Sequence, residues 1–465
     1  MPANRPLHRD RPRPDAAQRL ARRALILAVA IERFASGLLT SLLVFQLQRR
    51  WGFSAGQAAA WVGYVLAASY ITPLLGGVLC DRGLPARAAC VLGCAGIALG
   101  YLALTSDRQI ALLLGCGCLL VGAGLFRPGI QLLLDALCEG ASATDSAAPS
   151  ASAVQTDSAA AQPAAQPAPR RDEAYTWMHA LVNVGGMLAP LTSEGLQQAS
   201  GWSAVSAVAV GCMLFAIGLL YRGVPASVAR GGSRSAAPRG QNAQTADAAV
   251  SDDSGCAPVH GGSDGLLSPG TVMMLCVALA GFWMVYAQCS STLLLWAEGS
   301  VDRRVLGWTL PISVVAALPW ALVVVLAPGL MALFRRLRAR NQEPSTLGKL
   351  RLGFLAMAAG FFVLLLAALL STQGAAGVEK AHVAWLVLAL VAITVGELCV
   401  APLGPVLLLL IAPRRLRGLV MALWFGTLGV GFVAGGAFSQ LWGTLSPPWF
   451  FALACGLTLA AWKQV

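Results

Sequence analysis

Long apolar stretches alternate with short polar segments along most of the chain. Twelve of these stretches are long enough to cross a bilayer, since a helix rises about 1.5 Å per residue and the hydrocarbon core is about 30 Å thick. They are predicted at residues 24–47, 55–80, 88–105, 109–137, 174–195, 202–221, 268–297, 306–334, 350–371, 382–411, 416–440 and 446–462. The pattern therefore predicts an all-α integral membrane protein with twelve spanning helices.

Two polar segments interrupt this pattern, at residues 139–173 and 223–267. Both are rich in Ala, Ser, Pro and Gly and have almost no large apolar residues, so they cannot bury a core and are predicted to be disordered. The second segment divides the chain into two six-helix bundles, residues 24–222 and 268–465, behind a basic tail of residues 1–23. One large transporter superfamily is built from two such halves.

The positive charges indicate the orientation of these helices. If the N-terminus is inside, 25 of the 33 Lys and Arg residues fall in inside segments and six in outside loops. Cytoplasmic loops carry the excess of these residues, so both termini are predicted to be cytoplasmic, in a multi-pass protein of the inner (cytoplasmic) membrane. The net charge of +12 is mostly this topology signal, and no nucleic-acid partner is expected.

Composition agrees with a chain in which charge is scarce. Hydrophobic residues make up 57% of the chain and charged residues 12%, with a mean hydropathy of +0.68. Four charged residues nevertheless lie deep inside predicted spans: Glu32, Arg33, Arg127 and Glu397. Lipid exposure would cost each of them at least a few kcal/mol, so they are predicted to neutralise one another around a wet cavity. The alternative is that they only fix helix packing.

Other residues inside the spans also point to a cavity or to moving helices. Pro128 directly follows Arg127, and two prolines, Pro402 and Pro405, follow Glu397; prolines free backbone carbonyls and kink helices. His179 and Asn183 lie on one helix face, where they either contact a ligand or hydrogen-bond between helices.

The loop "GGVLCDRGLPAR" (76–87) resembles the Gly-x-x-x-Asp-Arg motif of the major facilitator superfamily. This resemblance implies a gating loop in which Gly77 permits close helix approach, while Asp81 and Arg82 make ion pairs at the cytoplasmic face. The alternative is a tight cytoplasmic turn that carries inside-positive charges.

Motifs along the whole chain resemble one group within that superfamily, the proton-dependent oligopeptide transporters. They occur in order and at suitable spacing: "IERF" (31–34), "GLFRPG" (124–129), "RRDEAYTWMHALVNVGGMLAPL" (170–191), "FWMVYAQCSS" (282–291), "EPSTLGKLRLG" (343–353), "GELCVAPLGP" (396–405) and "RRLRGLVMALWFGTLG" (414–429). The resemblance implies a twelve-helix major facilitator fold and proton-coupled uptake of di- and tripeptides by alternating access.

The same resemblance assigns roles to particular residues. Proton coupling is expected at Glu32, Arg33, Arg127 and Glu397. Substrate contacts are expected at Arg33, His179, Asn183, Gln288 and Trp424. The expected partners are a small-molecule substrate, protons and the lipid bilayer, with the transporter acting as a monomer.

The chain also departs from the family pattern. The first Glu of the Glu-x-x-Glu-Arg motif is replaced by Val29, and the two tyrosines that follow the motif are replaced by Ser36 and Gly37. An Arg and its Glu partner are replaced together, by Thr40 and Ala287; losing only one of them would leave an unpaired charge.

Two rival functions remain open at this stage. One is transport of another small organic solute, or transport without proton coupling. The other is a non-transporting membrane receptor or scaffold. An enzyme is not expected, and neither is a cofactor or a bound metal, because the sequence contains no nucleophile–base set, phosphate loop or metal-ligand cluster.

Overall fold

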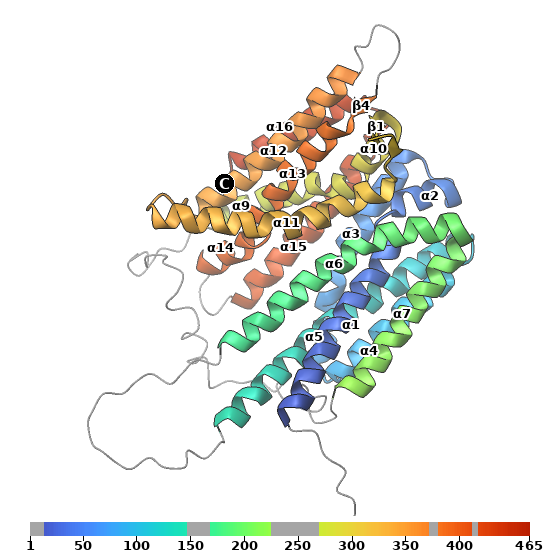
Figure 1. The fold of residues 1–465 in the computed structure, drawn as a ribbon. Helices are drawn as coiled ribbons and strands as arrows, with labels where there is room; N and C mark the ends of the chain where they lie inside the picture. Colours follow the sequence, from blue (N-terminus) through green and yellow to red (C-terminus); the bar gives the residue numbers. More distant parts are fainter. Residues whose placement is uncertain (1–13, 147–167, 225–268, 372–379, 412–416) are drawn as a thin grey trace, which may run out of the picture.

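The computed structural model describes residues 14–146, 168–224, 269–371, 380–411 and 417–465. The chain is mostly helical, and Figure 1 shows the helices in two groups. The first group contains α1 (Pro14–Thr40), α2 (Leu43–Trp51), α3 (Ala55–Asp81), α4 (Ala86–Ala103), α5 (Gln109–Ser146), α6 (Ala168–Ser200) and α7 (Trp202–Gly223).

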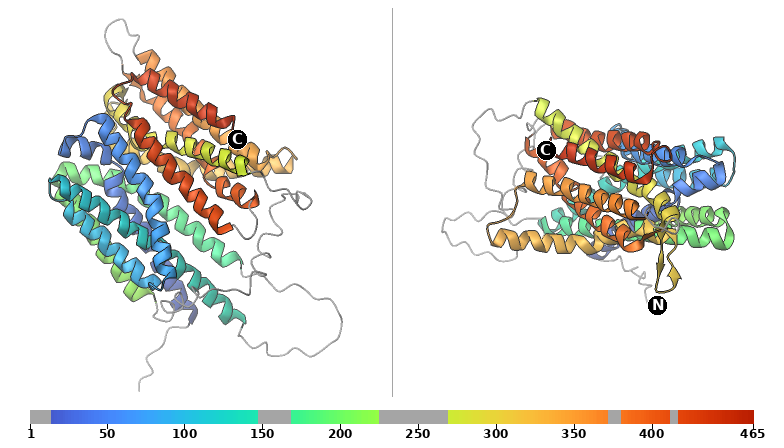
Figure 2. Two further views of the ribbon diagram at one scale, coloured as in Figure 1. Left: turned by 180° about the vertical axis from the view of Figure 1, so that it is seen from behind. Right: turned by 90° about the horizontal axis from the view of Figure 1, so that it is seen from above.

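The second group begins after residues 225–268, which lie outside the described residues. It contains α9 (Pro269–Tyr286), the short 3₁₀ helix η1 (Ala287–Ser290), α10 (Thr292–Ser300), α11 (Ile312–Ala339), α12 (Thr346–Ser371), α13 (Val383–Val400), α14 (Leu403–Ile411), α15 (Arg417–Ser439) and α16 (Pro447–Trp462). The left-hand view of Figure 2 shows the two groups side by side.

Four short strands accompany the second group. Strand β1 (Val301–Asp302) pairs in parallel with β4 (Ala381–His382), and β2 (Arg304–Val305) pairs with β3 (Trp308–Thr309) in an antiparallel hairpin. We call the end of the molecule that carries α2, α10 and this hairpin the hairpin end.

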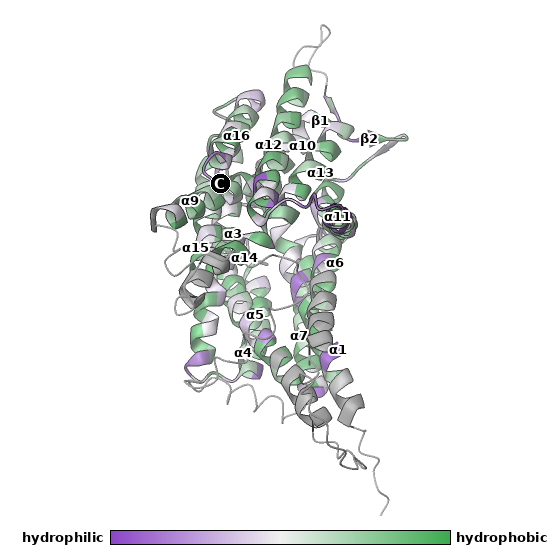
Figure 3. Cartoon of the chain, turned by 90° about the vertical axis from the view of Figure 1, so that its left-hand side faces the viewer, coloured by the Kyte–Doolittle hydropathy of each residue, from purple (hydrophilic) through white to green (hydrophobic). Residues whose placement is uncertain are grey.

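Within the described residues, eight helices are long and apolar enough to span a membrane, and nine if the bent pair α1 and α2 is one span. Figure 3 shows that hydrophobic residues dominate the helices of both groups. The chain is therefore a multi-pass membrane protein. Most of segments 139–173 and 223–267 lies outside the described residues, but α5 and α6 extend into the first of them from both sides.

Three spans differ from the sequence prediction. The first is broken after Thr40, and its two parts differ in direction by 43°. The span expected at 306–334 begins only at Ile312, because the hairpin occupies 304–309 and Pro311 precedes the helix. The tenth breaks into α13 and α14 around Pro402, since a proline removes a helix hydrogen bond. By contrast, α5 continues through Pro128.

Small residues set the closest helix contacts. A Cβ atom on Gly63 of α3 would lie 2.5 Å from the Cα of Gly436 on α15, so these helices touch backbone to backbone across the two groups. Helices α4 and α5 approach in the same way at Gly93, whose added Cβ would lie 2.7 Å from the Gly122 carbonyl oxygen. Close approach at small residues is the usual way in which membrane helices pack.

Polar contacts also join the two groups at the hairpin end. The Glu194 carboxylate on α6 accepts a hydrogen bond of 2.8 Å from the backbone N–H of Ser313, in the first turn of α11. An ion pair joins Arg49 of α2 to Glu298 of α10. A carboxylate at a helix N-terminus is favourable, so Glu194 helps to hold α11 against α6.

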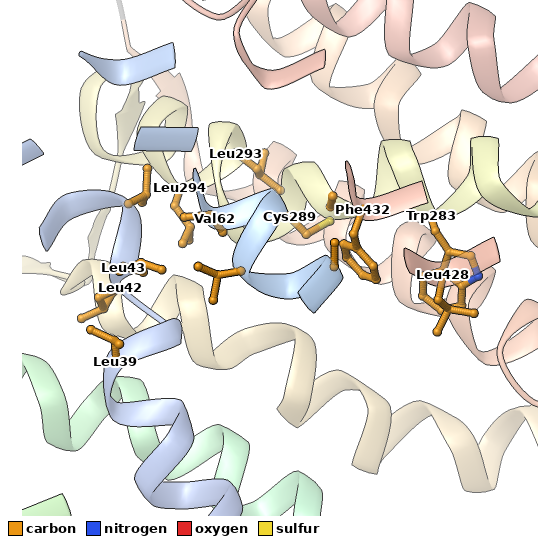
Figure 4. Close-up of a cluster of buried hydrophobic side chains, with 14 of the residues drawn as sticks. Leu39, Leu42, Leu43, Val62, Trp283, Cys289, Leu293, Leu294, Leu428 and Phe432 are labelled. Atoms are coloured by element: carbon orange, nitrogen blue, oxygen red, sulfur yellow. The ribbon is translucent and has the colours of Figure 1, made fainter. Parts of the chain in front are cut away.

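An apolar cluster fills the space behind these contacts. Figure 4 shows Leu43 and Val62 of the first group near Leu293 and Leu294 of the second, with Phe432 further along the same cluster. The two groups are therefore sealed together at the hairpin end by buried hydrophobic side chains.

Away from the hairpin end the two groups separate. Helices α6 and α11 touch at Gly186 and Trp320 and then diverge (Figure 1). Beyond this contact Val325 of α11 is 70% exposed, and on α3 the side chain of Leu75 is 62% exposed. The molecule is thus closed at the hairpin end and splayed at the other.

Candidate functional site

Three of the four predicted intramembrane charges lie together where α1 meets α5. Glu32 is 2% exposed and accepts a hydrogen bond of 2.9 Å from the Ser36 hydroxyl. Arg127 donates to the Ser69 carbonyl oxygen of α3 at 3.0 Å. Electrostatic interactions join Arg127 to both Glu32 and Arg33, although no direct ion pair forms between these three residues in the part of the chain that is described.

The two arginines keep unused hydrogen-bonding capacity. The Nε atoms of Arg33 and Arg127 are buried and have no hydrogen-bond partner among the described residues. Two neighbouring guanidinium groups also repel each other, and Glu32 supplies only one negative charge against them. A buried donor without a partner costs about 1–3 kcal/mol, so this corner favours an added anionic group that both arginines reach.

The fourth charge, Glu397, lies on α13 in the other group of helices. It is half-buried, and the Tyr286 hydroxyl of α9 lies within hydrogen-bonding reach of its carboxylate. Tyr70 of α3 interacts electrostatically with Arg33, Arg127 and Glu397. The two arginines lie on the first group of helices and Glu397 on the second, so Tyr70 is near charges of both signs and the site has a positive side and a negative side.

Aromatic rings line the second group near Glu397. Tyr70 stacks on Phe432 of α15, with ring centroids 5.2 Å apart and planes 7° from parallel. Trp283 contacts both Tyr286 and the predicted substrate residue Trp424 edge to face, at 5.3 and 6.2 Å. Trp424 is only 6% exposed, so it reaches the site through Trp283.

Sequence reasoning missed Tyr70 and Tyr286. Each is a tyrosine inside an apolar span, and a buried hydroxyl there needs a polar partner. A tyrosine inside an apolar span is visible in the sequence, but its position does not reveal which charged groups the hydroxyl contacts. That depends on the contact of α3 and α9 with the other helices.

The side chain of Gln288 is held in packing contacts. Its side chain is 0% exposed. The amide nitrogen donates to the carbonyl oxygens of Met284 and Gly435 at 3.1 and 3.0 Å, and the amide oxygen accepts from the hydroxyls of Thr292 and Ser439 at 3.0 and 2.8 Å. In this structure the amide is fully used in contacts within the protein, two of them between η1 and α15, and the expected substrate contact at Gln288 stays a prediction.

The two predicted residues of α6 have different outcomes. Asn183 is 5% exposed on the helix that packs against α1 and α11. It makes an interaction within the protein. The side chain of His179 lies outside the described residues, so its predicted substrate contact stays a prediction.

The predicted gating loop also differs in detail. The close helix approach is made by Gly76, where a Cβ atom would lie 2.1 Å from the Gly124 carbonyl oxygen, and a Cβ on Gly77 would have no atom within 4 Å. The packing glycine is thus Gly76, the residue before the predicted Gly77. Asp81 ends α3 and Arg82 follows it; both side chains are exposed and make no ion pair with another described residue.

Known proteins similar to this chain are transporters. Residues 270–446 match the model of the POT family. The chain is 27% identical over 435 residues to "Peptide transporter YePEPT" of Yersinia enterocolitica subsp. palearctica, covering 83% of this chain and 79% of the relative. It is 25% identical over 438 residues to "Dipeptide and tripeptide permease A" of Erwinia pyrifoliae, covering 87% of this chain and 82% of the relative.

Solved structures share the fold. The crystal structure of a peptide transporter POT in complex with sulfate has a TM-score of 0.72 at 20% identity, over 95% of this chain and 93% of that one. A POT family transporter in complex with a thioalcohol-conjugated peptide has a TM-score of 0.72 at 17% identity, over 95% and 94%. With the family match and the two relatives, these structures confirm the predicted resemblance: the second half of the chain matches the POT family model, and the chain is similar to peptide transporters over most of its length.

Proposed function

We propose that the protein carries di- and tripeptides inward across the cytoplasmic membrane together with protons. The observation that carries this proposal is the division of charge in the site. Arg33 and Arg127, in the first group of helices, have Nε donors without a partner among the described residues, and Glu397 lies in the second group, where it interacts with Tyr70. A peptide with a carboxylate at one end and an ammonium group at the other matches both sides at once.

The proposed transport cycle is alternating access between the two groups of helices. In it, twelve spans form two six-helix bundles (residues 24–222 and 268–465), with both termini cytoplasmic and segments 139–173 and 223–267 as cytoplasmic linkers. In that orientation the hairpin end faces outside, and the splayed end, where Val325 and Leu75 are exposed, faces the cytoplasm. Asp81 and Arg82 then lie at the inner gate.

The proposed coupling uses the two carboxylates. An arginine stays protonated at all relevant pH values, so Arg127 cannot release a proton during a cycle, and Glu32 and Glu397 are the titratable members. A carboxylate near an arginine favours its charged form, and one away from it favours the neutral form. In the proposed cycle, a change in the distance between a site carboxylate and Arg127 couples proton movement to transport.

A second candidate is transport of a small zwitterion other than a peptide. Thr40 and Ala287 stand where an ion pair is expected from the family pattern. Among the described residues the Thr40 hydroxyl donates to the Ser36 carbonyl oxygen of its own helix at 3.1 Å and to no other group, and Ala287 is 2% exposed. The same substrate charges fit the site in either case, so a screen of peptides, amino acids and nucleosides for thermal stabilisation separates the two candidates.

The test is uptake of radiolabelled dialanine into proteoliposomes with and without an inward proton gradient. We expect the gradient to drive accumulation by the wild-type protein, and we expect Glu32→Gln and Glu397→Gln to abolish it. Glu343→Gln, which removes a carboxylate outside the site, is the matched control and should accumulate peptide. Accumulation that ignores the gradient would remove the coupling claim, and normal accumulation by both site variants would remove the roles of Glu32 and Glu397.

A further inference from the structure

The hairpin of residues 304–309 is a defined element that the transport site does not use. Its register pairs Arg304 with Thr309 and Val305 with Trp308. The base is fixed at Arg303, whose carbonyl oxygen accepts from the Leu310 N–H at 2.9 Å and whose guanidinium donates back to the Leu310 carbonyl oxygen at 2.6 Å. The tip is therefore held in one position relative to α11.

The hairpin has one apolar face and one polar face. Residues directly opposite each other in an antiparallel pair point to the same side, so Val305 and Trp308 share one face, and Arg304 and Thr309 share the other. Leu306 is at the tip. Its side chain is 99% exposed, and those of Trp308 and Val305 are 81% and 37% exposed.

The geometry of the turn does not explain the leucine. Leu306 and Gly307 have φ angles of 50° and 84°, the arrangement in which two-residue hairpin turns favour Asn followed by Gly. A residue with a Cβ atom is disfavoured at positive φ, and Leu306 gains no packing within the described chain. What compensates for this apolar side chain must lie outside the protein.

The position of the hairpin identifies that environment. It connects the spanning segment Gly270–Ser300 to the span that begins at Ile312, so it lies at the edge of the hydrocarbon layer. Figure 3 shows β2 projecting sideways from the helices and not onward beyond their ends. Side chains at its tip thus face the region that lipid occupies around the bundle.

A second exposed tryptophan marks the same level. Trp449, in the first turn of α16, is 71% exposed. The segment before this helix lies at the hairpin end, because a Cβ atom on Gly56, at the start of α3, would lie 3.0 Å from the Trp442 carbonyl oxygen. Tryptophans gather at the boundary between hydrocarbon and headgroups. The exposed guanidinium of Arg304 suits the phosphates of that boundary.

We propose that the hairpin of residues 304–309 is a membrane-interface anchor, in which Val305, Leu306 and Trp308 enter the boundary between acyl chains and headgroups while Arg304 contacts lipid phosphates. The anchor holds the start of α11, the helix whose Ser313 N–H bonds to Glu194 of the other group. The anchor would hold α11 in the same way whatever solute the transporter carries, so this proposal does not depend on the proposed substrate.

Photo-crosslinking in phospholipid vesicles tests the anchor. The photoreactive residue p-benzoylphenylalanine replaces Leu306, Trp308 or Thr309 in three separate full-length proteins, and mass spectrometry detects the adducts after illumination. Thr309 is the matched control, because it lies on the polar face of the same hairpin. We expect phospholipid adducts at Leu306 and Trp308 to exceed those at Thr309 by about tenfold, the preference that burying one large apolar side chain provides.

Two results would overturn the anchor. Equal phospholipid yields at all three positions would mean that the apolar face has no preferred contact with lipid. A cross-linked dimer in place of phospholipid adducts at Leu306 would mean that the tip docks on a second copy of the chain. Since all three replaced side chains are exposed, the variants should elute as the wild-type protein does in detergent, and this elution profile checks that they are folded.

Discussion

Replacing Gln288 with methionine separates a packing role from a substrate role at this position. Met has a similar length and no hydrogen-bonding amide, so Gln288→Met removes four bonds, two of them to Gly435 and Ser439 of α15. Hydrogen bonds between membrane helices contribute about 0.6 kcal/mol each on average, so losing the two bonds to α15 should cost about 1 kcal/mol. The Thr292 hydroxyl also loses the acceptor that it uses in the wild-type protein.

The assay combines thermal unfolding in detergent with dialanine uptake at low temperature. We expect Gln288→Met to unfold at a lower temperature while its KM for dialanine stays that of the wild-type protein. Gln109→Met is the matched control, because Gln109 is exposed at the start of α5, and it should change neither quantity. A raised KM for Gln288→Met with unchanged thermal stability would refute the packing role and return Gln288 to the substrate site.

Two further predictions concern residues at the splayed end, one in α3 and one in the loop between α11 and α12. Gly76→Ala should destabilise the protein by about 1–3 kcal/mol, because its Cβ would overlap α5 and overpacking has a cost of this size. The control variant Gly77→Ala should unfold at the same temperature as the wild-type protein. A thermal unfolding experiment in which Gly77→Ala is the less stable variant would contradict the assignment of Gly76 as the packing glycine. Between α11 and α12, hydrogen bonds from Arg338 and Lys349 hold the pKa of Glu343 at about 2, below its ordinary value of 4.5. A depressed pKa stabilises the loop above the ordinary value, and this stabilisation is lost as the pH falls towards 2. Glu343→Gln should therefore speed hydrogen exchange in residues 340–346 at pH 6 and change it little at pH 2; an equal effect at both pH values would exclude the ion pairs as the cause.

The intramembrane charges were predictable from the sequence, because charge inside an apolar span is costly and has to meet a partner. Glu32, Arg33 and Arg127 do lie together. No direct ion pair joins these three among the described residues; Arg127 interacts electrostatically with Glu32 and Arg33, and Tyr70 interacts with both arginines and with Glu397. Helix periodicity predicts which face a residue is on, and it does not predict the distance between two helices.

Local breaks and close contacts were harder to predict for the same reason. Apolar residues continue through Thr40 and through the hairpin at 304–309, so hydropathy alone joined α1 to α2 and began α11 six residues early. Gly76 and Gly77 are adjacent and equally small, and only the approach of α5 shows which one is needed. The amide of Gln288 was equally suited to a ligand or to a carbonyl oxygen until its neighbours were known.

The central claim is that the two sides of the site bind the two charged ends of a peptide. Binding of dialanine, N-acetyl-dialanine and dialanine amide to the purified wild-type protein, measured by calorimetry, tests it most directly. We expect blocking either end to weaken binding by at least about tenfold, since each block removes one charge-assisted hydrogen bond. Equal affinity for dialanine and for both singly blocked peptides would mean that the site does not bind the charged ends.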